Sequence, residues 1–212
     1  MTVMSERPPT SHERRAGQPW DASYTDGPAP WDVGRPQPAI VRLASAGAFA
    51  GAVLDAGCGT GDNALHVAAL GLHVLGFDVA ETALSIARAK AAERGLDAEF
   101  VIADALQLDR LGREFDTVLD SGLFHTFDGT ERRDYAQGLA SVTRRGGHLY
   151  VLCFGDVGAG PHGPHPVSHD ELRAAFDGSA GWSVDSVSPE WIETRFHAAP
   201  GAPAWLAAIE RS

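Results

Sequence analysis

The stretch VLDAGCGTGDN (residues 53–63) joins a short apolar run to a glycine-rich turn. A strand that ends in Asp55 and is followed by Gly57, Gly59 and Gly61 lets the backbone turn tightly and presents free N–H groups and a helix N-terminus to a ligand. A dinucleotide-binding motif requires Gly-x-Gly-x-x-Gly, whereas here the third glycine comes one position earlier and an aspartate follows it. The spacing therefore predicts a nucleotide-like ligand and disfavours a dehydrogenase.

Acidic residues end three successive predicted strands. Asp55 precedes the glycines, where its carboxylate would repel a pyrophosphate and attract a cationic amine such as that of S-adenosylmethionine. Asp78 follows 78 − 55 = 23 positions later, close to the separation of about 20 at which a carboxylate binds ribose hydroxyls. Asp104 is placed to accept a hydrogen bond from an adenine amino group. Each acid alone is equally typical of a turn or helix cap, but together with the glycine loop they predict a cofactor site.

Short apolar runs alternate with amphipathic stretches along the rest of the chain, which is typical of an α/β fold with a mostly parallel sheet. The predicted strands cover 52–57, 73–78, 99–104, 115–122 and 146–154, and the predicted helices cover 38–48, 63–70, 81–94, 131–143 and 168–176. Two further alternating stretches, 182–187 with 191–196 and then 202–209, have no helix between them. We therefore expect them to pair as an antiparallel hairpin.

The composition indicates one soluble globular domain of 212 residues, because 44% of the residues are hydrophobic and 21% are charged. The formal net charge of −11 opposes nucleic-acid binding, and the arginine pairs at 132–133 and 144–145 are too short for a basic footprint. Two cysteines, no apolar run of about 20 residues and no signal-like N-terminus predict a cytoplasmic protein without a membrane partner.

The N-terminal region differs in composition from the rest of the chain. Residues 1–17 are polar and aperiodic, which predicts a disordered tail ahead of a single domain over 18–212. Within that domain, residues 18–48 are expected to form a lid and a helix. Trp20, Tyr24 and Trp31 lie among turn-forming residues, and flexible turns around aromatic side chains suit a cover over bound ligands.

The motifs together resemble those of the class I, Rossmann-like S-adenosylmethionine-dependent methyltransferases. VLDAGCGTGDNA is similar to the first motif of that family, Asp78 to the second, ADAL (103–106) to the third and DTVLDSGLFHTF (116–127) to the fourth. The resemblance implies a three-layer sandwich with a seven-stranded sheet in the order 3-2-1-4-5-7-6, strand 7 being antiparallel. It also implies S-adenosylmethionine as cofactor and S-adenosylhomocysteine as product.

A second resemblance concerns the stretch PWDASYTDGPAPWDVGRPQP (19–38). It resembles the aromatic entry segment of thiopurine, halide and thiol methyltransferases, and is more similar still to actinobacterial enzymes that methylate heterocyclic toxins such as hydroxyquinolones. The two resemblances and the residue pattern imply cofactor contacts by Trp20, Trp31, Asp55, Gly57, Cys58, Gly59, Gly61, Asn63, Asp78, Val79, Asp104, Ala105, Asp120, Ser121 and Gly122. Contacts with the acceptor are expected from Tyr24, Trp31, Phe124, His125 and Phe154.

His125 is the candidate general base, since it follows the fourth strand and imidazole titrates near neutral pH. An equal alternative is that it only packs beneath the lid, and acidic acceptors would need no base. Residues 120–123 read Asp-Ser-Gly-Leu and lack the Asp/Asn-Pro-Pro motif of amino-methylating nucleic-acid enzymes. His162, His165, His169 and Asp170 lie in a Pro/Gly-rich loop without a recognised ligand spacing, so no metal is expected.

Several functions remain open from the sequence. The leading hypothesis is methyl transfer to a hydroxyl or ring nitrogen of a small aromatic heterocycle, because the aromatic entry segment would stack on a flat acceptor. The second is a thiol or halide methyltransferase on the same fold. A catalytically inert protein that binds S-adenosylmethionine ranks below both, and a dehydrogenase ranks last. The pattern specifies neither the acceptor nor the oligomeric state.

Overall fold

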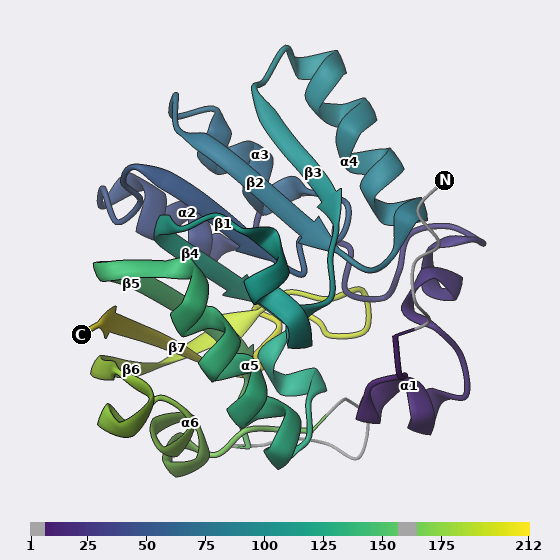
Figure 1. Ribbon diagram of the computed structural model, residues 1–212. Coiled ribbons are helices and arrows are strands. Elements are labelled where there is room, and N and C mark those ends of the chain that lie inside the picture. The colour runs from purple at the N-terminus through teal and green to yellow at the C-terminus, as the bar shows by residue number, and fades with distance from the viewer. Residues whose placement is uncertain (1–6, 157–164) are drawn as a thin grey trace.

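A computed structural model of the protein describes residues 7–156 and 165–212. A sheet forms the centre of the fold. Its seven strands run in the order β3-β2-β1-β4-β5-β7-β6 (Figure 1). Neighbouring strands from β3 to β5 are parallel, and β7 is antiparallel to both β5 and β6. The predicted strand order, the antiparallel strand 7 and the terminal hairpin are confirmed. The strands are β1 (Ala52–Ala56), β2 (His73–Asp78), β3 (Ala98–Ile102), β4 (Phe115–Ser121), β5 (Thr143–Phe154), β6 (Trp182–Ile192) and β7 (Ala202–Arg211).

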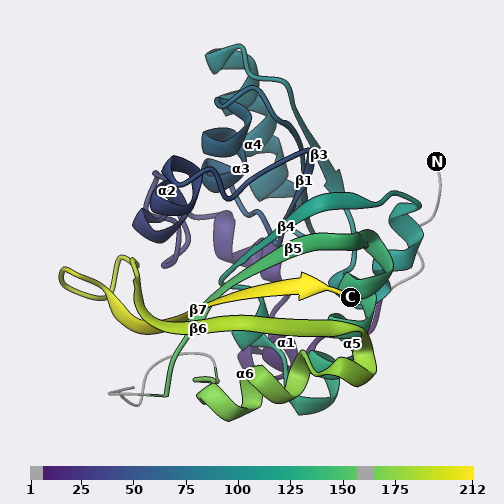
Figure 2. The ribbon, with the colours of Figure 1, turned by 90° about the vertical axis from the view of Figure 1, so that its left-hand side faces the viewer.

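Helices cover both faces of this sheet, as the predicted three-layer sandwich requires (Figures 1 and 2). One face packs against the first group of helices through residues such as Ile40, Leu65 and Leu84. The other packs against the second group through residues such as Leu139 and Leu172. The first group is α2 (Pro38–Ser45), α3 (Asp62–Ala68) and α4 (Glu81–Arg94), and the second is α5 (Gly129–Val142) and α6 (His169–Ala175) with the 3-10 helix η2 (Ala105–Leu111). Because both faces are covered, β1 and β4 are buried along almost their whole length.

Local signals in the sequence set the ends of the helices. α5 begins with a capping box between Asp128 and Glu131, and α6 begins with one between Ser168 and Glu171. α4 ends at Gly95, whose backbone is left-handed, a conformation that glycine adopts without strain. These caps place most of the predicted helices within a few residues of their observed bounds.

Two predictions about the segments around the sheet are wrong. Residues 7–17 do not form part of a disordered tail. Helix α1 (Ser11–Ala16) begins with a capping box between Thr10 and Glu13, and both of these residues are buried. The backbone N–H of Ser11 also donates to Glu131 at the start of α5 (2.7 Å). The prediction for residues 1–6 lies outside the described residues. Residues 193–196 were predicted as part of a strand, but β6 ends at Ile192 and a loop follows.

The order of the strands places the ligand site. The strand order reverses between β1 and β4, and in open parallel sheets ligands bind at the carboxyl ends of the strands beside such a reversal. The short helices η1 (Trp20–Tyr24) and η3 (Phe124–Thr126) both contribute side chains there. Among residues 7–156 and 165–212, no helix is long and apolar enough to span a bilayer.

Candidate functional site

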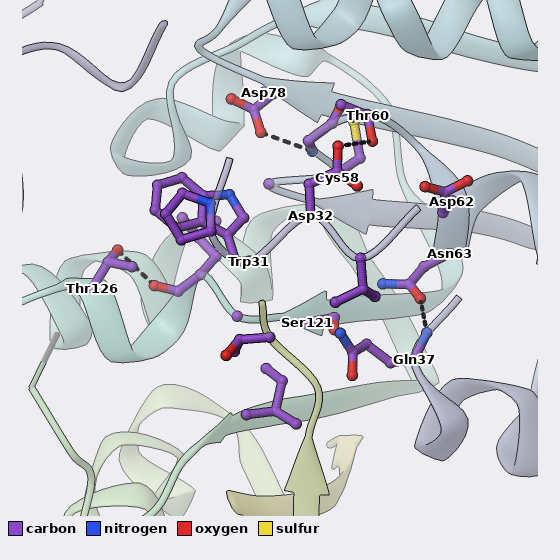
Figure 3. A pocket seen from close by; sticks show the side chains of 18 of the residues that line it. Trp31, Asp32, Gln37, Cys58, Thr60, Asp62, Asn63, Asp78, Ser121 and Thr126 are labelled. Carbon is purple, nitrogen blue, oxygen red and sulfur yellow. Dashed lines mark hydrogen bonds between the residues drawn. The ribbon is translucent and has the colours of Figure 1, made fainter. Parts of the chain in front are cut away.

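A cavity of about 860 Å³ lies at the carboxyl ends of the parallel strands (Figure 3). Two sets of residues line it, and they come from different parts of the chain. The strand-end half consists of turns that follow β1, β2, β3 and β4, and it includes Gly57, Cys58, Gly59, Asp78, Val79, Ala105, Ser121 and Gly122. The cover half comes from the N-terminal region and the β6–β7 loop, and it includes His12, Trp20, Tyr24, Trp31, Phe196 and His197.

The glycine loop of the strand-end half requires glycine for two physical reasons. Gly57, Gly59 and Gly61 all have positive φ angles of 53° to 81°, which other residues adopt only with strain. At Gly61 a Cβ would also lie 2.9 Å from the Cβ of Ala87 in α4. The loop therefore lies close against the rest of the fold while it presents its backbone to the cavity.

Asp78 ends β2 and holds the glycine loop. Its Oδ2 accepts from the backbone N–H of Gly59 (2.9 Å, Figure 3), and its Oδ1 accepts from that of Ala80 (2.9 Å). Burial raises the pKa of this carboxyl, and the two main-chain donors act in the opposite direction. Each carboxylate oxygen has a second lone pair, so Asp78 can still accept hydrogen bonds from a ligand in the cavity it lines.

Asp55 lies beneath the glycine loop, outside the cavity lining. It is buried, and its Oδ2 has no hydrogen-bond partner in the described part of the chain. Burial is the main cause that raises its pKa to about 7, and the nearby carboxylates of Asp120 and Asp78 add to the effect. A buried acid without a partner is stabilised by a cation bound nearby. A ligand with a positively charged centre, such as a sulfonium or an amine, therefore fits the electrostatics of this half.

A polar network missed by sequence reasoning connects the two halves. Asp32 in the N-terminal segment accepts from the hydroxyl of Thr60 in the glycine loop (3.0 Å, Figure 3). Lys90 of α4 donates to the same hydroxyl (3.0 Å) and to Asp62 (2.7 Å). The backbone N–H of Gln37 donates to Asn63 at the start of α3 (2.9 Å). These contacts fasten the N-terminal segment to the loop that holds the ligand.

The aromatic residues of the N-terminal segment form one cluster over the cavity. Trp31 packs edge-on against both Trp20 and Tyr24, and its indole N–H donates to the Tyr24 hydroxyl (2.9 Å). The ring of His12 stacks on Trp20 at 4.3 Å. The Tyr24 hydroxyl lies 3.2 Å from the position that a Cβ on Gly59 would take, so the cover half contacts the glycine loop directly.

The β6–β7 loop closes the other side of the cover half. The backbone N–H of Arg195 donates to the carbonyl of Pro30 (2.8 Å), and Arg35 forms an ion pair with Glu193 (2.9 Å). Phe196 in this loop is 77% exposed although it lines the cavity. An exposed phenylalanine at the edge of a cavity offers apolar surface to a ligand that reaches the opening.

His125 lies in η3 between the two halves and is only 4% exposed. Its Nδ1 accepts from the backbone N–H of Phe154 (3.2 Å), and its ring packs on the Phe154 ring at 4.3 Å. Burial is the main cause that lowers its pKa to about 3, and Arg132, His12 and His165 lower it further. At neutral pH the ring is therefore uncharged.

Comparison with known proteins identifies this arrangement. The chain is 40% identical to a 2-heptyl-1-hydroxyquinolin-4(1H)-one methyltransferase of Mycobacteroides abscessus over 163 residues, which are 76% of this chain and 71% of the relative. The chain belongs to the S-adenosylmethionine-dependent methyltransferases. The family model described as a methyltransferase domain matches residues 53–147. The chain is also 31% identical to the probable thiol methyltransferase 2 of Arabidopsis thaliana, over 73% of this chain and 69% of that relative.

Solved structures share the fold of this chain. A structure from work on the conversion of a disulfide bond into a thioacetal group during echinomycin biosynthesis superimposes with a TM-score of 0.77 and 39% identity, covering 87% of this chain and 85% of that chain. Magnesium protoporphyrin IX methyltransferase from Synechocystis, with bound S-adenosylhomocysteine, has the same fold, with a TM-score of 0.65 and 24% identity over 82% of this chain and 80% of that one. The cofactor of this methyltransferase is S-adenosylmethionine.

Most of the predicted site residues of the methyltransferase lie together on the cavity wall. They are Trp20, Tyr24, Trp31, Gly57, Cys58, Gly59, Asn63, Asp78, Val79, Ala105, Ser121, Gly122, His125 and Phe154. Sequence reasoning missed several residues of the lining, among them His12, Asp32, Thr60, Phe196 and His197. Thr60 lies within the glycine motif and Asp32 within the aromatic segment 19–38, so both were visible signals. Nothing in the sequence places positions 12, 196 and 197 near the others.

Five predicted residues of the methyltransferase lie outside the lining, for identifiable reasons. Asp55 lies beneath the glycine loop, and Gly61 faces α4. Asp104 caps η2 by accepting from the backbone N–H of Leu106 (3.0 Å). Asp120 accepts from two main-chain N–H groups and the hydroxyl of Tyr135, and Phe124 is fully buried. The contacts of Asp120 are Leu123 (2.9 Å), Phe124 (3.0 Å) and Tyr135 (2.9 Å).

The histidine-rich loop does not form a metal site in the part of the methyltransferase that the structure describes. His165 contacts Arg15 of α1, and His169 lies 3.5 Å from Asp170 at the start of α6. His162 lies outside the described residues. His165 is thus part of the contact between the N-terminal region and the segment before α6.

Proposed function

We propose that this methyltransferase transfers a methyl group from S-adenosylmethionine to a hydroxyl or ring nitrogen of a small aromatic heterocycle of the hydroxyquinolone type. The observation that carries the proposal is the aromatic cluster of Trp20, Tyr24 and Trp31 over a cavity whose opposite wall is the glycine loop. Flat aromatic rings stack on such side chains. The relative at 40% identity is named for a hydroxyquinolone acceptor, which supports the same class.

The strand-end half fits the cofactor. Asp78 would accept hydrogen bonds from ribose hydroxyls while it keeps its two main-chain donors. The buried acid Asp55 would lower the energy of a positive charge held above it. When bound, the cofactor supplies a methyl group that its sulfonium has already activated.

The cover half has three tasks in this proposal. Its aromatic side chains hold the acceptor flat, its closure excludes water, and its ties to Thr60 and Asn63 keep the acceptor in line with the cofactor. Predominantly apolar side chains, including Trp31, Phe154 and Phe196, line this part of the cavity. A small molecule rather than a polymer is therefore the partner we infer. The net charge of −11 also supports a partner other than nucleic acid.

Methylation of thiols or halide ions is the second candidate, because a relative at 31% identity is named as a probable thiol methyltransferase. A competition assay separates the two. Purified enzyme receives labelled S-adenosylmethionine with a 1-hydroxyquinolin-4-one, an aliphatic thiol and iodide at equal concentrations. We expect the heterocycle to be methylated with a kcat/KM at least about tenfold higher, since stacking and apolar burial favour it by more than about 1.4 kcal/mol.

Preferential turnover of iodide or the thiol would overturn the first candidate in favour of the second. Tight binding of S-adenosylhomocysteine without methyl transfer to any acceptor would instead support an inert binding protein.

We also place the reaction in the cytoplasm, because neither cysteine forms a disulfide: Cys58 and Cys153 are both free thiols.

A further inference from the structure

The fold fixes which nitrogen of His125 carries a proton. Nδ1 faces the backbone N–H of Phe154 at 3.2 Å, and an amide N–H can only donate. Nδ1 must therefore be the unprotonated, accepting nitrogen. A neutral imidazole with an accepting Nδ1 carries its hydrogen on Nε2. In residues 7–156 and 165–212 no protein group is hydrogen-bonded to Nε2, and the side chain lines the cavity.

The surroundings of His125 oppose a second proton on the ring. Arg132 of α5, His12 of α1 and His165 before α6 all disfavour a positive charge there. His197 lines the same cavity from the β6–β7 loop. The nearest carboxylate on the preceding strand, Asp120, is directed to the N–H groups of residues 123 and 124 and to a tyrosine hydroxyl, so it does not stabilise an imidazolium.

This geometry is incompatible with the general-base role, which was one of two equal alternatives from the sequence. To take a proton on Nε2, neutral His125 would need its hydrogen on Nδ1, directly against the N–H of Phe154. Taking the proton would then convert the ring to an imidazolium, whose Nδ1–H would still face the N–H of Phe154, in a buried position beside Arg132. Both states lose the main-chain hydrogen bond. The ring is built to donate from Nε2 and not to accept there.

We propose that His125 is a hydrogen-bond donor to an acceptor that binds already ionised, so that the enzyme selects heterocycles with an acidic hydroxyl and needs no base. This inference rests on the proposed function. The acceptor loses its proton to solvent before it binds, and Nε2–H then donates to its anionic oxygen. That oxygen attacks the methyl carbon while the bond from carbon to sulfur breaks with its electron pair going to sulfur. A neutral methyl ether and S-adenosylhomocysteine result, so charge and atoms balance.

The electrostatics on the acceptor side agree with an anionic ligand. The guanidinium of Arg132 is buried over the ring of Phe124 at 5.3 Å, and its Nε has no hydrogen-bond partner in the described part of the chain. Arg132 pairs with the exposed carboxylate of Glu171 (3.6 Å), and its guanidinium still disfavours a second positive charge on His125 despite the negative net charge of the whole protein. A like-charged acceptor would be repelled here, whereas a phenolate-type oxygen is stabilised.

The first test is the pH dependence of kcat/KM for two hydroxyquinolines whose own pKa values differ by about two. We expect the acidic limb of each profile to follow the pKa of the acceptor, so that the two midpoints are separated. A shared midpoint for both acceptors would indicate an ionising group of the enzyme and would overturn the inference. If the wild-type protein methylates neither compound, the proposed function itself fails, and this inference fails with it.

The second test uses a matched pair of variants. His125→Gln places an amide donor near the position of Nε2 but has no basic atom, so we expect it to retain a kcat/KM about tenfold above that of a variant without a donor. His125→Leu removes the donor, and we expect a loss of about ten- to a hundredfold, the range for a hydrogen bond to a charged group. Affinity for S-adenosylhomocysteine and the melting temperature serve as controls for folding. An equally large loss in His125→Gln, with both controls unchanged, would restore the base role.

Discussion

The two halves of the cavity are built from different kinds of structure. The strand-end half consists of main-chain turns that follow buried parallel strands, and its conformation is set by glycines and by the hydrogen bonds of Asp78. The cover half consists of side chains brought from the two ends of the chain, and polar ties such as those between Arg35 and Glu193 hold it together. In the proposed function, the strand-end half holds the cofactor and the separately attached cover half selects the acceptor.

The strongest way to break this comparison is to remove the cover. Deleting residues 1–35 removes the whole aromatic cluster together with Asp32. We expect turnover to fall by about a thousandfold or more, because water reaches the cofactor and the acceptor is no longer oriented. The melting temperature without ligand should fall only slightly, since this segment adds to the body a small separate cluster in which Tyr24 and Ala29 meet Ala80 and Ala83.

Thermal denaturation of the truncated protein with and without S-adenosylhomocysteine measures its ligand-free melting temperature and the shift that the ligand adds. We expect the protection by the ligand to be largely lost. A large drop in the ligand-free melting temperature, with the ligand-induced shift preserved, would mean that the cover is a structural strap and not a lid.

A second prediction concerns the charge buried under the strand-end half. Asp55 ionises near pH 4 in the unfolded chain, but its pKa in the folded protein is about 7. The folded state therefore holds an extra proton between these values, and the free energy of unfolding falls by up to about 4 kcal/mol as the pH rises from 4 to 7. Asp55→Asn removes this contribution.

Chemical denaturation at pH 5 and pH 8 checks the prediction for Asp55. As the pH rises, the free energy of unfolding of Asp55→Asn should increase relative to that of the wild type, with most of the difference present at pH 8. If the free energies of unfolding of the two proteins differ by the same amount at pH 5 and pH 8, the pKa of Asp55 is not raised in the folded protein. S-adenosylmethionine should reduce the difference at pH 8, because its positive charge stabilises the ionised carboxylate of the wild type alone.

The third prediction sharpens the assignment of the strand-end half. Asp78→Ala should weaken the binding of S-adenosylhomocysteine by about ten- to a hundredfold, the cost of about 1.5 to 3 kcal/mol for losing charge-assisted hydrogen bonds. Calorimetry measures the affinity. Asp104→Ala is the matched control, because Asp104 follows the neighbouring strand β3 but is occupied in capping η2. Unchanged affinity in Asp78→Ala would remove this residue from the site.

The smallest predicted effect concerns one hydrogen bond within the cover half. Trp31→Phe keeps an aromatic ring but removes the N–H that donates to the Tyr24 hydroxyl. We expect the KM for the acceptor to rise by about two- to tenfold, as for a single neutral hydrogen bond, while affinity for S-adenosylhomocysteine stays the same. A change in cofactor affinity alone would mean that Trp31 acts on the cofactor and not on the acceptor.

The same difference between the halves explains what the sequence could reveal. Gly57, Gly59 and Asp78 were predicted as site residues because one continuous motif and one regular spacing specify the strand-end half. Asp104 lies two residues beyond the end of β3, and Asp120 lies one residue before the end of β4. Nearby main-chain N–H groups occupy both carboxylates, and the sequence does not show which acids are used in such local hydrogen bonds.

The cover half was less predictable because tertiary contacts create it. His12 lay in a stretch whose polar composition indicated disorder, yet a capping box and a hydrogen bond to Glu131 order it. Phe196 lies in a loop without a motif and reaches the cavity only because the β6–β7 hairpin lies beside the N-terminal segment. The protonation state of His125 depends on one main-chain N–H that is 29 residues away.

The contact between the N-terminal segment and the β6–β7 loop has a consequence for biosynthesis. Arg35 and Glu193 are separated by 158 residues, so the ribosome must add all of these residues after Arg35 before the two side chains can meet. Synthesis proceeds from the N-terminus at about 5 to 20 residues per second. The strands that carry the glycine loop thus leave the ribosome well before the hairpin that completes the cover. Throughout that interval the N-terminal segment of the nascent chain lacks its contacts with the β6–β7 loop, such as those of Pro30 and Arg35.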